Sequence, residues 1–231
     1  NQRLFVVDVV VETEKDTARF GAHMEMEARF VPGHVTVAGF GVERTRVIQF
    51  VDTEFQNFSH VPNASGFGAP SGSGLTNLFG YAQHSWIIVP QVEVVAGLRL
   101  DKRIAGGNLD ANDSAFQLAL SPRVAVVASP LPEVTTKWMY GRAFRSPNVR
   151  ETLVDAIFDE EDGEYPFARG SLSVGPERID TVETELRWDG APGFGASIAG
   201  SYSRLDREID KVTPPNEYTN LPGGMNILGI E

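Results

Sequence analysis

Cysteine is absent from the 231 residues of this sequence, which excludes a disulfide framework, a thiolate metal site and a cysteine nucleophile. Basic residues are scarce: 20 Lys and Arg stand against 31 Asp and Glu, giving a formal charge of −11. A nucleic-acid partner is therefore not expected, because no stripe of cations is available to neutralise phosphates. The sequence also lacks an apolar run of the roughly 20 residues that a membrane-spanning helix needs. A transmembrane β-barrel is not excluded, because each of its strands shows only about ten residues of alternating hydrophobicity.

Hydrophobic residues make up 42% of the chain and charged residues 22%, a balance that excludes a disordered chain. The length fits one all-β or α/β domain, or two small ones. The sequence begins at Asn1 with neither a methionine nor a basic and apolar signal segment. It is therefore expected to be a processed product, a recombinant product or a piece of something longer.

An alternation of period two is the clearest local pattern. Between Phe20 and Phe30 every second residue is apolar, and the residues between them are glycine, histidine, glutamate or arginine. A helix would mix these two sets around its circumference, whereas a strand places them on opposite faces. The same alternation returns in 92–100, 116–128 and 181–188. These segments are predicted to be β-strands.

About ten strands are predicted, at roughly 3–13, 18–31, 34–48, 78–89, 91–104, 114–129, 132–145, 178–189, 194–210 and 223–231. Short connections rich in proline or glycine alternate with long ones. The short turns are "VPGH" (31–34), "VPQ" (89–91), "SPLP" (129–132) and "DGAPG" (189–193). The long connections are about 49–77, 105–113, 146–177 and 211–222. A further turn, "TEKDT" (13–17), is brief but lies on the long-loop side. In an antiparallel meander this places the short turns at one end, as in outer-membrane barrels.

Strand length also favours a membrane barrel. Many segments run about 11–16 residues, whereas strands of soluble sheets average about 5–6 and a tilted membrane strand needs about 9–11. Trp86 and Trp188 precede short turns and Tyr140 lies toward a long loop, as interfacial aromatic girdles require, although each ring alone would fit ordinary core packing. We therefore predict an all-β fold: an antiparallel transmembrane β-barrel with long extracellular loops and short periplasmic turns.

Several phrases in the sequence resemble the strand segments of TonB-dependent outer-membrane receptors. One pair of phrases resembles a late barrel strand, the long extracellular loop that follows it and the return strand: "YGRAFRSPNVRETL" (140–153) and "GPERIDTVETELRW" (175–188). The residues that carry this likeness are Tyr140, Gly141, Phe144, Arg145, Ser146, Pro147, Pro176, Glu177 and Glu183. "YAQHSWIIVPQVEVVAGLRLD" (81–101), "LSPRVAVVASP" (120–130) and "NILGIE" (226–231) resemble other strands of the family. The likeness covers roughly residues 78–231.

The resemblance implies a 22-stranded barrel occluded by an N-terminal plug, which imports scarce ligands such as ferric siderophores across the bacterial outer membrane with energy delivered through TonB. About ten of those strands are recognised here, without a plug or a TonB-contacting segment. Residues 1–231 are therefore expected to be part of the barrel domain, with the plug domain absent. The implied partners are a small-molecule ligand, the TonB complex through the missing plug, and outer-membrane lipid. No cofactor and no metal site is expected.

Arginines inside the barrel or at its mouth are the candidate ligand contacts. The alternation turns Arg145 into the lumen at the loop-side rim and turns Arg142 outward, toward the level of the lipid head groups. Guanidinium groups there suit an anionic ligand such as a ferric siderophore. Ion pairs with lumen carboxylates such as Glu183 are the simpler explanation. The full candidate set is Arg142, Arg145, Arg99, Arg123 and Glu183.

Other polar clusters carry weaker hypotheses. The acidic loop 151–167 could hold Ca²⁺ or attract a cationic ligand, although a solvated loop explains it more simply. His23, Glu25 and Glu27 share a strand face but lack a fourth metal ligand. No histidine lies between residues 147 and 176, which disfavours haem as the ligand of a receptor of this kind.

An enzyme is not expected, because carboxylates recur on nearly every polar face and no pair or triad stands out. Two alternatives to an active transporter stay open. One is a soluble or surface β-structure that binds carbohydrate or protein through its long loops. The other is a passive, porin-like channel.

Overall fold

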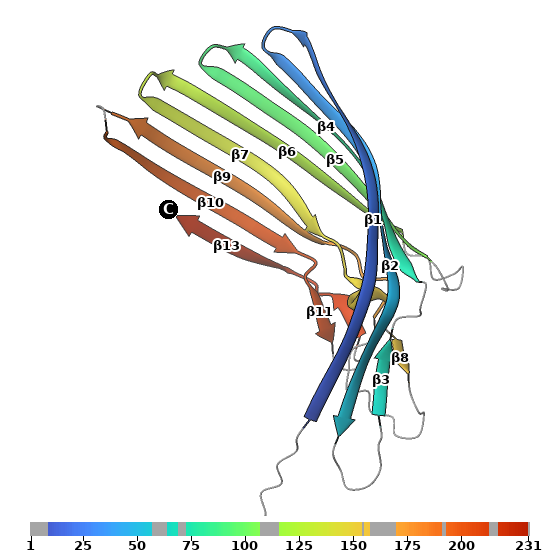
Figure 1. Ribbon diagram of the computed structural model, residues 1–231. Helices are drawn as coiled ribbons and strands as arrows, with labels where there is room; N and C mark the ends of the chain where they lie inside the picture. The colour runs from blue at the N-terminus through green and yellow to red at the C-terminus, as the bar shows by residue number, and fades with distance from the viewer. Residues whose placement is uncertain are drawn as a thin grey trace, which may run out of the picture.

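A computed structural model describes residues 9–56, 64–68, 73–106, 116–153, 155–157, 170–190, 193–212 and 217–230. In this part of the chain, nine strands of seven or more residues form the frame (Figure 1). They are β1 (Val9–Val31), β2 (His34–Gln56), β4 (Gly74–Val89), β5 (Val92–Gly106), β6 (Phe116–Leu131), β7 (Val134–Arg145), β9 (Glu177–Asp189), β10 (Gly195–Asp206) and β13 (Gly224–Ile230). The shorter elements are β3 (Ala64–Gly68), α1 (Val149–Leu153), β8 (Asp155–Ile157), β11 (Ile209–Val212) and β12 (Glu217–Asn220).

The long strands form one antiparallel sheet in which neighbours in the chain are neighbours in space. The order along its main path is β13-β10-β9-β7-β6-β5-β4-β2-β3-β8, and β1 pairs with β2. The sheet curves but does not close, so β1 and β13 stand at its two ends (Figure 1). Strands β11 and β12 pair with each other as a separate hairpin. The predicted all-β antiparallel barrel fold is confirmed, as an open part of a barrel wall.

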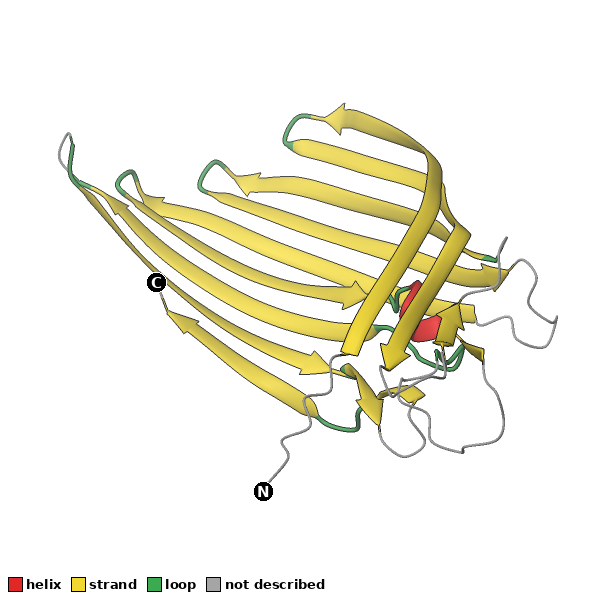
Figure 2. Cartoon of the chain, turned by 60° about the horizontal axis from the view of Figure 1, so that its bottom comes forward, coloured by secondary structure: helices red, strands yellow, loops and turns green. Residues whose placement is uncertain are grey.

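The short turns gather at one end of the sheet and the longer connections at the other (Figures 1 and 2). Gly33, in the turn between β1 and β2, has φ +79°, and Gly193, before β10, has φ +86°. A side chain with a Cβ rarely adopts this left-handed conformation, so glycine suits both turns. The sorting of turns and loops that the sequence predicted is therefore confirmed.

The predicted turn at 13–17 is wrong, because β1 runs unbroken from Val9 to Val31. Its pairing with β2 shifts register between Asp16 and Thr17. The extra residue of this β-bulge is Ile48 of β2, whereas β1 advances one residue at a time. Residues 13–17 are all polar, so the alternation disappears there although the strand continues. The two predicted strands 3–13 and 18–31 are thus one, as far as the described residues extend.

The predicted long connections also contain more structure than expected. Strand β2 continues to Gln56, β3 spans Ala64–Gly68 and β4 begins at Gly74, so 17 of the 29 residues of 49–77 are strand. The connection 146–177 contains α1 and β8, and β8 pairs with β3 from the first long connection. The predicted strand 194–210 ends at Asp206, where Arg207 has φ +62° and turns the chain into β11.

The two faces of the sheet differ in chemistry. Even-numbered residues of the long strands form an outward face with exposed apolar side chains, among them Met24, Leu98 and Leu186. Odd-numbered residues form the inner face, where neighbouring side chains lean over the glycines: a Cβ on Gly41 would lie 2.5 Å from the ring of Phe79. Such crowding is expected on the concave side of a curved sheet. The arrangement fits a barrel wall with lipid outside and water inside.

The wall has almost no dry core. In the described part of the chain the buried apolar residues are Val47, Leu75, Ala119, Val174 and Ile209. No helix in that part is long and apolar enough to cross a membrane. One layer of strands that exposes its apolar face is unstable in water, because an apolar surface of this extent must be covered.

Candidate functional site

A hollow on the inner face brings together two of the predicted ligand contacts, Arg123 and Glu183. It lies where β6, β7 and β9 meet, and Arg123, Gly141 and Thr181 are in register across these strands. A Cβ added at Gly141 would meet nothing within 4 Å. The missing side chain therefore leaves room between a guanidinium and a carboxylate, which could bind the oxygens and the amino or hydroxyl groups of a polar ligand.

A second hollow adjoins the first and shares Glu183 with it. Lys137 and Glu185 flank it, with 3.8 Å between the Lys137 Nζ and a Glu185 oxygen. Its floor consists of small inward residues, Ala199, Ser201 and Gly229, on the neighbouring strands β10 and β13. The two hollows together form an open trough along the inner wall, lined by apolar side chains such as Val95 and Met139 as well as by the charged groups.

Arg123 keeps part of its hydrogen-bonding capacity free in this trough. Its Nη2 donates a hydrogen bond to the Gln83 side chain on β4, and Arg123 makes no other hydrogen bond with a residue that the structure describes. Glu183 makes no hydrogen bond or ion pair with a residue that the structure describes. Both groups can therefore accept a ligand without first breaking a strong ion pair.

Arg99 is held by its own strand instead. Its Nε and Nη2 donate to the two Asp101 oxygens at 2.7 and 2.8 Å. The guanidinium also lies 4.4 Å from the centre of the Phe79 ring, a cation–π arrangement. Asp101 is 2% exposed and accepts a further hydrogen bond from Asn77 Nδ2 at 3.0 Å. Arg99 thus braces the wall, as the simpler sequence hypothesis held for this set of arginines.

Sequence reasoning missed several residues of the inner wall. Tyr81 donates a hydrogen bond to Glu25 across β2, and Asn77 joins the Arg99 pair. The small residues that floor the trough were not recognised either. Their odd numbers were a usable signal, because inward positions follow from parity once the outward apolar face is known.

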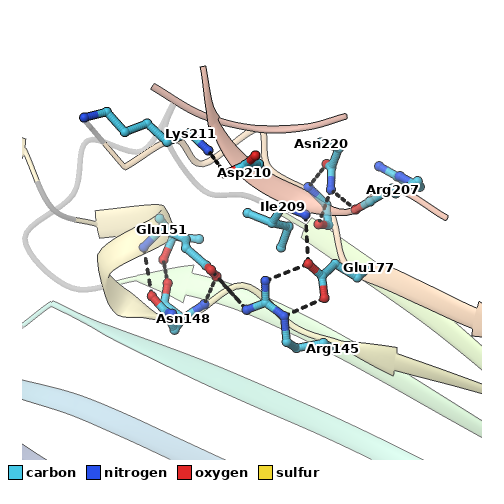
Figure 3. Close-up of polar contacts among 11 residues, drawn as sticks. Arg145, Asn148, Glu151, Glu177, Arg207, Ile209, Asp210, Lys211 and Asn220 are labelled. Atoms are coloured by element: carbon cyan, nitrogen blue, oxygen red, sulfur yellow. Dashed lines mark hydrogen bonds and ion pairs between the residues drawn. The ribbon is translucent and has the colours of Figure 1, made fainter. Parts of the chain in front are cut away.

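At the loop-side rim, Arg145 joins two carboxylates from different segments (Figure 3). Its Nε and Nη2 donate to Glu177 at 2.6 and 2.8 Å, and its Nη1 donates to both Glu151 oxygens at 3.0 and 3.1 Å. Glu177 also accepts from the Ile209 backbone N–H at 2.8 Å. We call Arg145, Glu151, Glu177 and the Ile209 amide the rim cluster. It ties β7, α1, β9 and the β11–β12 hairpin together.

The partners of Arg145 differ from the one named in the sequence hypothesis. An ion pair with a carboxylate was expected, but Glu183 is not the partner, because it opposes Met139 deeper in the wall. Glu177 is directly opposite Arg145 in register. Glu151 comes from α1, whose existence within the long loop was not predicted.

The charges of the rim cluster stabilise one another. The Glu177 carboxylate raises the pKa of Arg145, with Glu151 adding to the effect against the cost of burial. The Arg145 guanidinium and the Ile209 amide lower the pKa of Glu177. Nearby, burial lowers the pKa of Arg103 to about 10, and only the charge of Glu151 opposes that shift. Arg145 and Glu177 are therefore ionised at neutral pH.

A capping box places Glu151. The Asn148 backbone N–H donates to Glu151 Oε2 at 2.8 Å, and the Glu151 N–H donates to Asn148 Oδ1 at 2.9 Å (Figure 3). On the hairpin side, Asn220 bonds the carbonyls of Gly175 and Arg207 at 3.0 and 2.8 Å. The rim cluster therefore lies between two locally braced segments.

Arg142 lies on the outward face, as its parity predicted. Its Nε and Nη2 donate to Asp180 at 2.9 and 3.2 Å, and the Tyr140 hydroxyl donates to the same carboxylate at 2.6 Å. It is thus separated from Arg123, Arg99 and Glu183 by the thickness of the wall. A role in ligand binding for any of the five predicted residues stays a prediction.

The hypotheses for the His23 strand face and for the acidic loop 151–167 have different outcomes. No group of three metal-ligating side chains occurs in the part of the chain that the structure describes. Glu25 and Glu27, proposed as ligands with His23, instead bond to Tyr81 and Arg29. Of the acidic loop, Glu151 serves the rim cluster, whereas 158–167 lie outside the described residues.

Comparisons with known proteins agree with this geometry. A family model described as TonB dependent receptor-like, beta-barrel matches residues 9–231. The vitamin B12 transporter BtuB of Vibrio cholerae serotype O1 is 29% identical over 101 residues, which are 44% of this chain and 14% of that protein. The chain therefore matches only a small part of the length of this curated relative.

Solved structures show the same fold. The copper transporter OprC superposes with a TM-score of 0.68 at 16% identity, over 95% of this chain and 34% of that one. The FrpB iron transporter of Neisseria meningitidis gives 0.62 at 12% identity, over 93% and 33%. With an apolar outward face, charged residues on the inner face and a family match that runs from β1 to the end of the chain, this chain belongs to the TonB-dependent receptors, which are β-barrel proteins of the bacterial outer membrane.

Proposed function

We propose that this chain forms part of the barrel of an active transporter, which binds a scarce small ligand and imports it with energy delivered through TonB. The observation that supports this most is the family match over residues 9–231. The soluble alternative is not retained, because the family resides in the outer membrane and the outward face is apolar.

An anionic metal chelate such as a ferric siderophore is the ligand class that we infer. Arg123 and Lys137 face the trough, where a wide, flat ligand can contact both. Guanidinium and ammonium groups bind catecholate, hydroxamate or carboxylate oxygens by charge-assisted hydrogen bonds. Glu183, between them, would accept from ligand N–H or O–H groups and would disfavour a ligand that carries only negative charge.

The full-length receptor tests this proposal in cells that lack it. Growth on a panel of ferric siderophores as the sole iron source should depend on the receptor and on TonB. Arg123→Gln with Lys137→Gln should reduce uptake of the active siderophore at least tenfold, because two charge-assisted contacts are lost. Arg29→Gln is the matched control, since Arg29 is exposed near the short-turn end and pairs with Glu27.

A passive channel predicts a different result. Uptake would then persist without TonB and would rise in proportion to external concentration. Uptake that is saturable but unaffected by the Arg123 and Lys137 substitutions would support the transporter and reject this trough as its binding site. No uptake of any ferric siderophore would reject the ligand class.

A further inference from the structure

Two of the four histidines of the chain lie side by side on the outward face, near the short-turn end of the wall. His34 is the first residue of β2, and His84 lies on the neighbouring strand β4, where Thr36 is its partner in register. The His34 Nδ1 is 3.1 Å from the His84 Nε2. One imidazole nitrogen from each strand therefore faces the same small space.

The separation of these two nitrogens suits two ligands of one metal ion. Zinc binds imidazole nitrogen at about 2.0–2.1 Å. Two nitrogens on one such ion are then about 2.9 Å apart when they subtend a right angle and about 3.3 Å apart at the tetrahedral angle. The observed 3.1 Å lies between these values. Both rings can thus bind one ion with little change in the distance between their nitrogens.

Each ring is also oriented by a second residue. The Thr36 hydroxyl is 2.8 Å from the His84 Nδ1. It accepts a hydrogen bond in the tautomer that carries the proton on Nδ1, and this tautomer leaves the lone pair on the Nε2 that faces His34. The His34 ring stacks on Trp86, with ring centres 5.8 Å apart and planes at 22°. Metal-binding histidines usually have their tautomer and orientation fixed by such neighbours.

The space in front of the pair is accessible from outside the wall. His84 is exposed and His34 is half-buried. The residues that flank Thr36 and His84 in register on the next strands are small, Ala28 on β1 and Ala96 on β5. Within the described residues no carboxylate joins the two histidines as a third ligand. Water would therefore occupy the remaining coordination positions of a bound ion, which could exchange with solution.

We propose that His34 and His84 form a two-histidine site for a divalent transition-metal ion, with Thr36 as a positioning residue. Imidazole suits Cu²⁺, Ni²⁺ and Zn²⁺, whereas Mg²⁺ and Ca²⁺ prefer oxygen ligands. Cu²⁺ should bind more tightly than Zn²⁺, as it does at most sites with nitrogen ligands. The site is on the opposite face of the wall from the trough, so it is independent of the ligand proposed there.

Binding exchanges one hydrogen bond for two metal–nitrogen bonds. Without metal, the His34 Nδ1–H donates to the His84 Nε2. When the ion binds, the His34 Nδ1 releases its proton to water and the Nε2 takes one up, so the ring stays neutral and both lone pairs face the ion. The ion then joins β2 to β4, and because the unfolded chain does not hold the two rings together, it stabilises the folded wall.

Copper binding by the full-length receptor, purified in detergent without a histidine tag, tests the proposal. Equilibrium dialysis at micromolar Cu²⁺ would measure the affinity, and electron paramagnetic resonance would count the nitrogens on the ion. His34→Gln and His84→Gln should each lose one bound copper that has two nitrogen ligands. Thr36→Val should weaken binding of that copper about 10- to 100-fold, and Thr36→Ser should restore it.

The matched control is His23→Gln, which removes a histidine from the inner face of β1 and should leave the two-nitrogen signal unchanged. A signal that persists in His34→Gln and His84→Gln would overturn the proposal, and so would an equal loss in His23→Gln. Unchanged affinity in Thr36→Val would overturn the role given to Thr36. His34→Asn and His84→Asn decide the question should a glutamine variant fail to fold. Excess Zn²⁺ should displace the copper, and displacement by Mg²⁺ instead would contradict a site made of imidazoles.

Discussion

Removing the guanidinium of Arg145 should open the loop-side rim while leaving the barrel wall intact. In Arg145→Gln, Glu151 and Glu177 lose a partner that now makes four hydrogen bonds of 2.6–3.1 Å. Their side chains are only 10% and 13% exposed, so water cannot fully replace that partner. Breaking a buried ion pair costs about 3–5 kcal/mol and an exposed one at most about 1 kcal/mol. Because Arg145 is itself 45% exposed, we expect about 2–3 kcal/mol.

Hydrogen exchange measured by mass spectrometry on the full-length receptor resolves this effect by segment. A loss of about 2–3 kcal/mol corresponds to roughly 30- to 150-fold faster exchange. The increase should appear at 148–153 and at the Ile209 amide, which donates to Glu177. Amides in the middle of β7 and β9 should keep their protection, because their bonds belong to the sheet.

Arg142→Gln is the control for this experiment. It removes the same charge from the same strand, but its partner is Asp180 on the outward face. Exchange in 148–153 and at Ile209 should not change. Unaltered exchange in Arg145→Gln, or equal acceleration in both variants, would refute the view that the rim cluster holds the loop segments.

Three further outcomes follow from the same structure. Lowering pH should loosen the rim, since the depressed pKa of Glu177 gives stability that is complete above its unfolded pKa of about 4.3 and is lost as pH falls through the lower folded value. Protection factors of the rim amides, each corrected for the intrinsic exchange rate at that pH, should be constant from pH 5 to 8 and lower below about pH 4. Val124→Arg should cost about 2–4 kcal/mol in a refolding assay into lipid vesicles, whereas Ala125→Arg, one residue on but facing inward, should cost less than about 1 kcal/mol. Gly41→Ala should destabilise the barrel by about 1–3 kcal/mol, because its Cβ would lie 2.5 Å from a ring and 2.8 Å from a backbone oxygen, but Gly141→Ala should be neutral in the same assay because its Cβ would meet nothing within 4 Å.

The sequence predicted the strands of the wall well because their constraint is local. A residue such as Leu98 faces lipid and its neighbours face water, so the alternation appears directly in the chain. The same rule correctly turned Arg142 outward and Arg145 inward. It failed at 13–17, where all five residues are polar, so the alternation disappears although the strand continues.

The rim was much less predictable, because its contacts join distant segments. Arg145 pairs with Glu177, 32 residues away, and the Ile209 amide binds the same carboxylate across another loop. Alternation carries no information on such contacts. One local signal was available: Asn148 and Glu151 have the spacing of a capping box, which would have indicated the start of α1. Four-residue strands such as β11 are too short for a clear period.

The level of each side chain along its strand is a second kind of information, separate from the face it occupies. Trp86 and Trp188 lie outward near the short turns, and Arg44 and Lys102 lie outward some ten residues further along their strands. Indole rings favour one membrane interface and cations favour phosphate at the other, so each group opposes sliding of the wall in one direction. If so, replacing Arg44 and Lys102 by glutamine should shift the depth of the barrel, which spin labels placed along an outward strand would measure as a change in accessibility to oxygen. A barrel whose depth is unchanged without those cations would show that the apolar band alone sets its position.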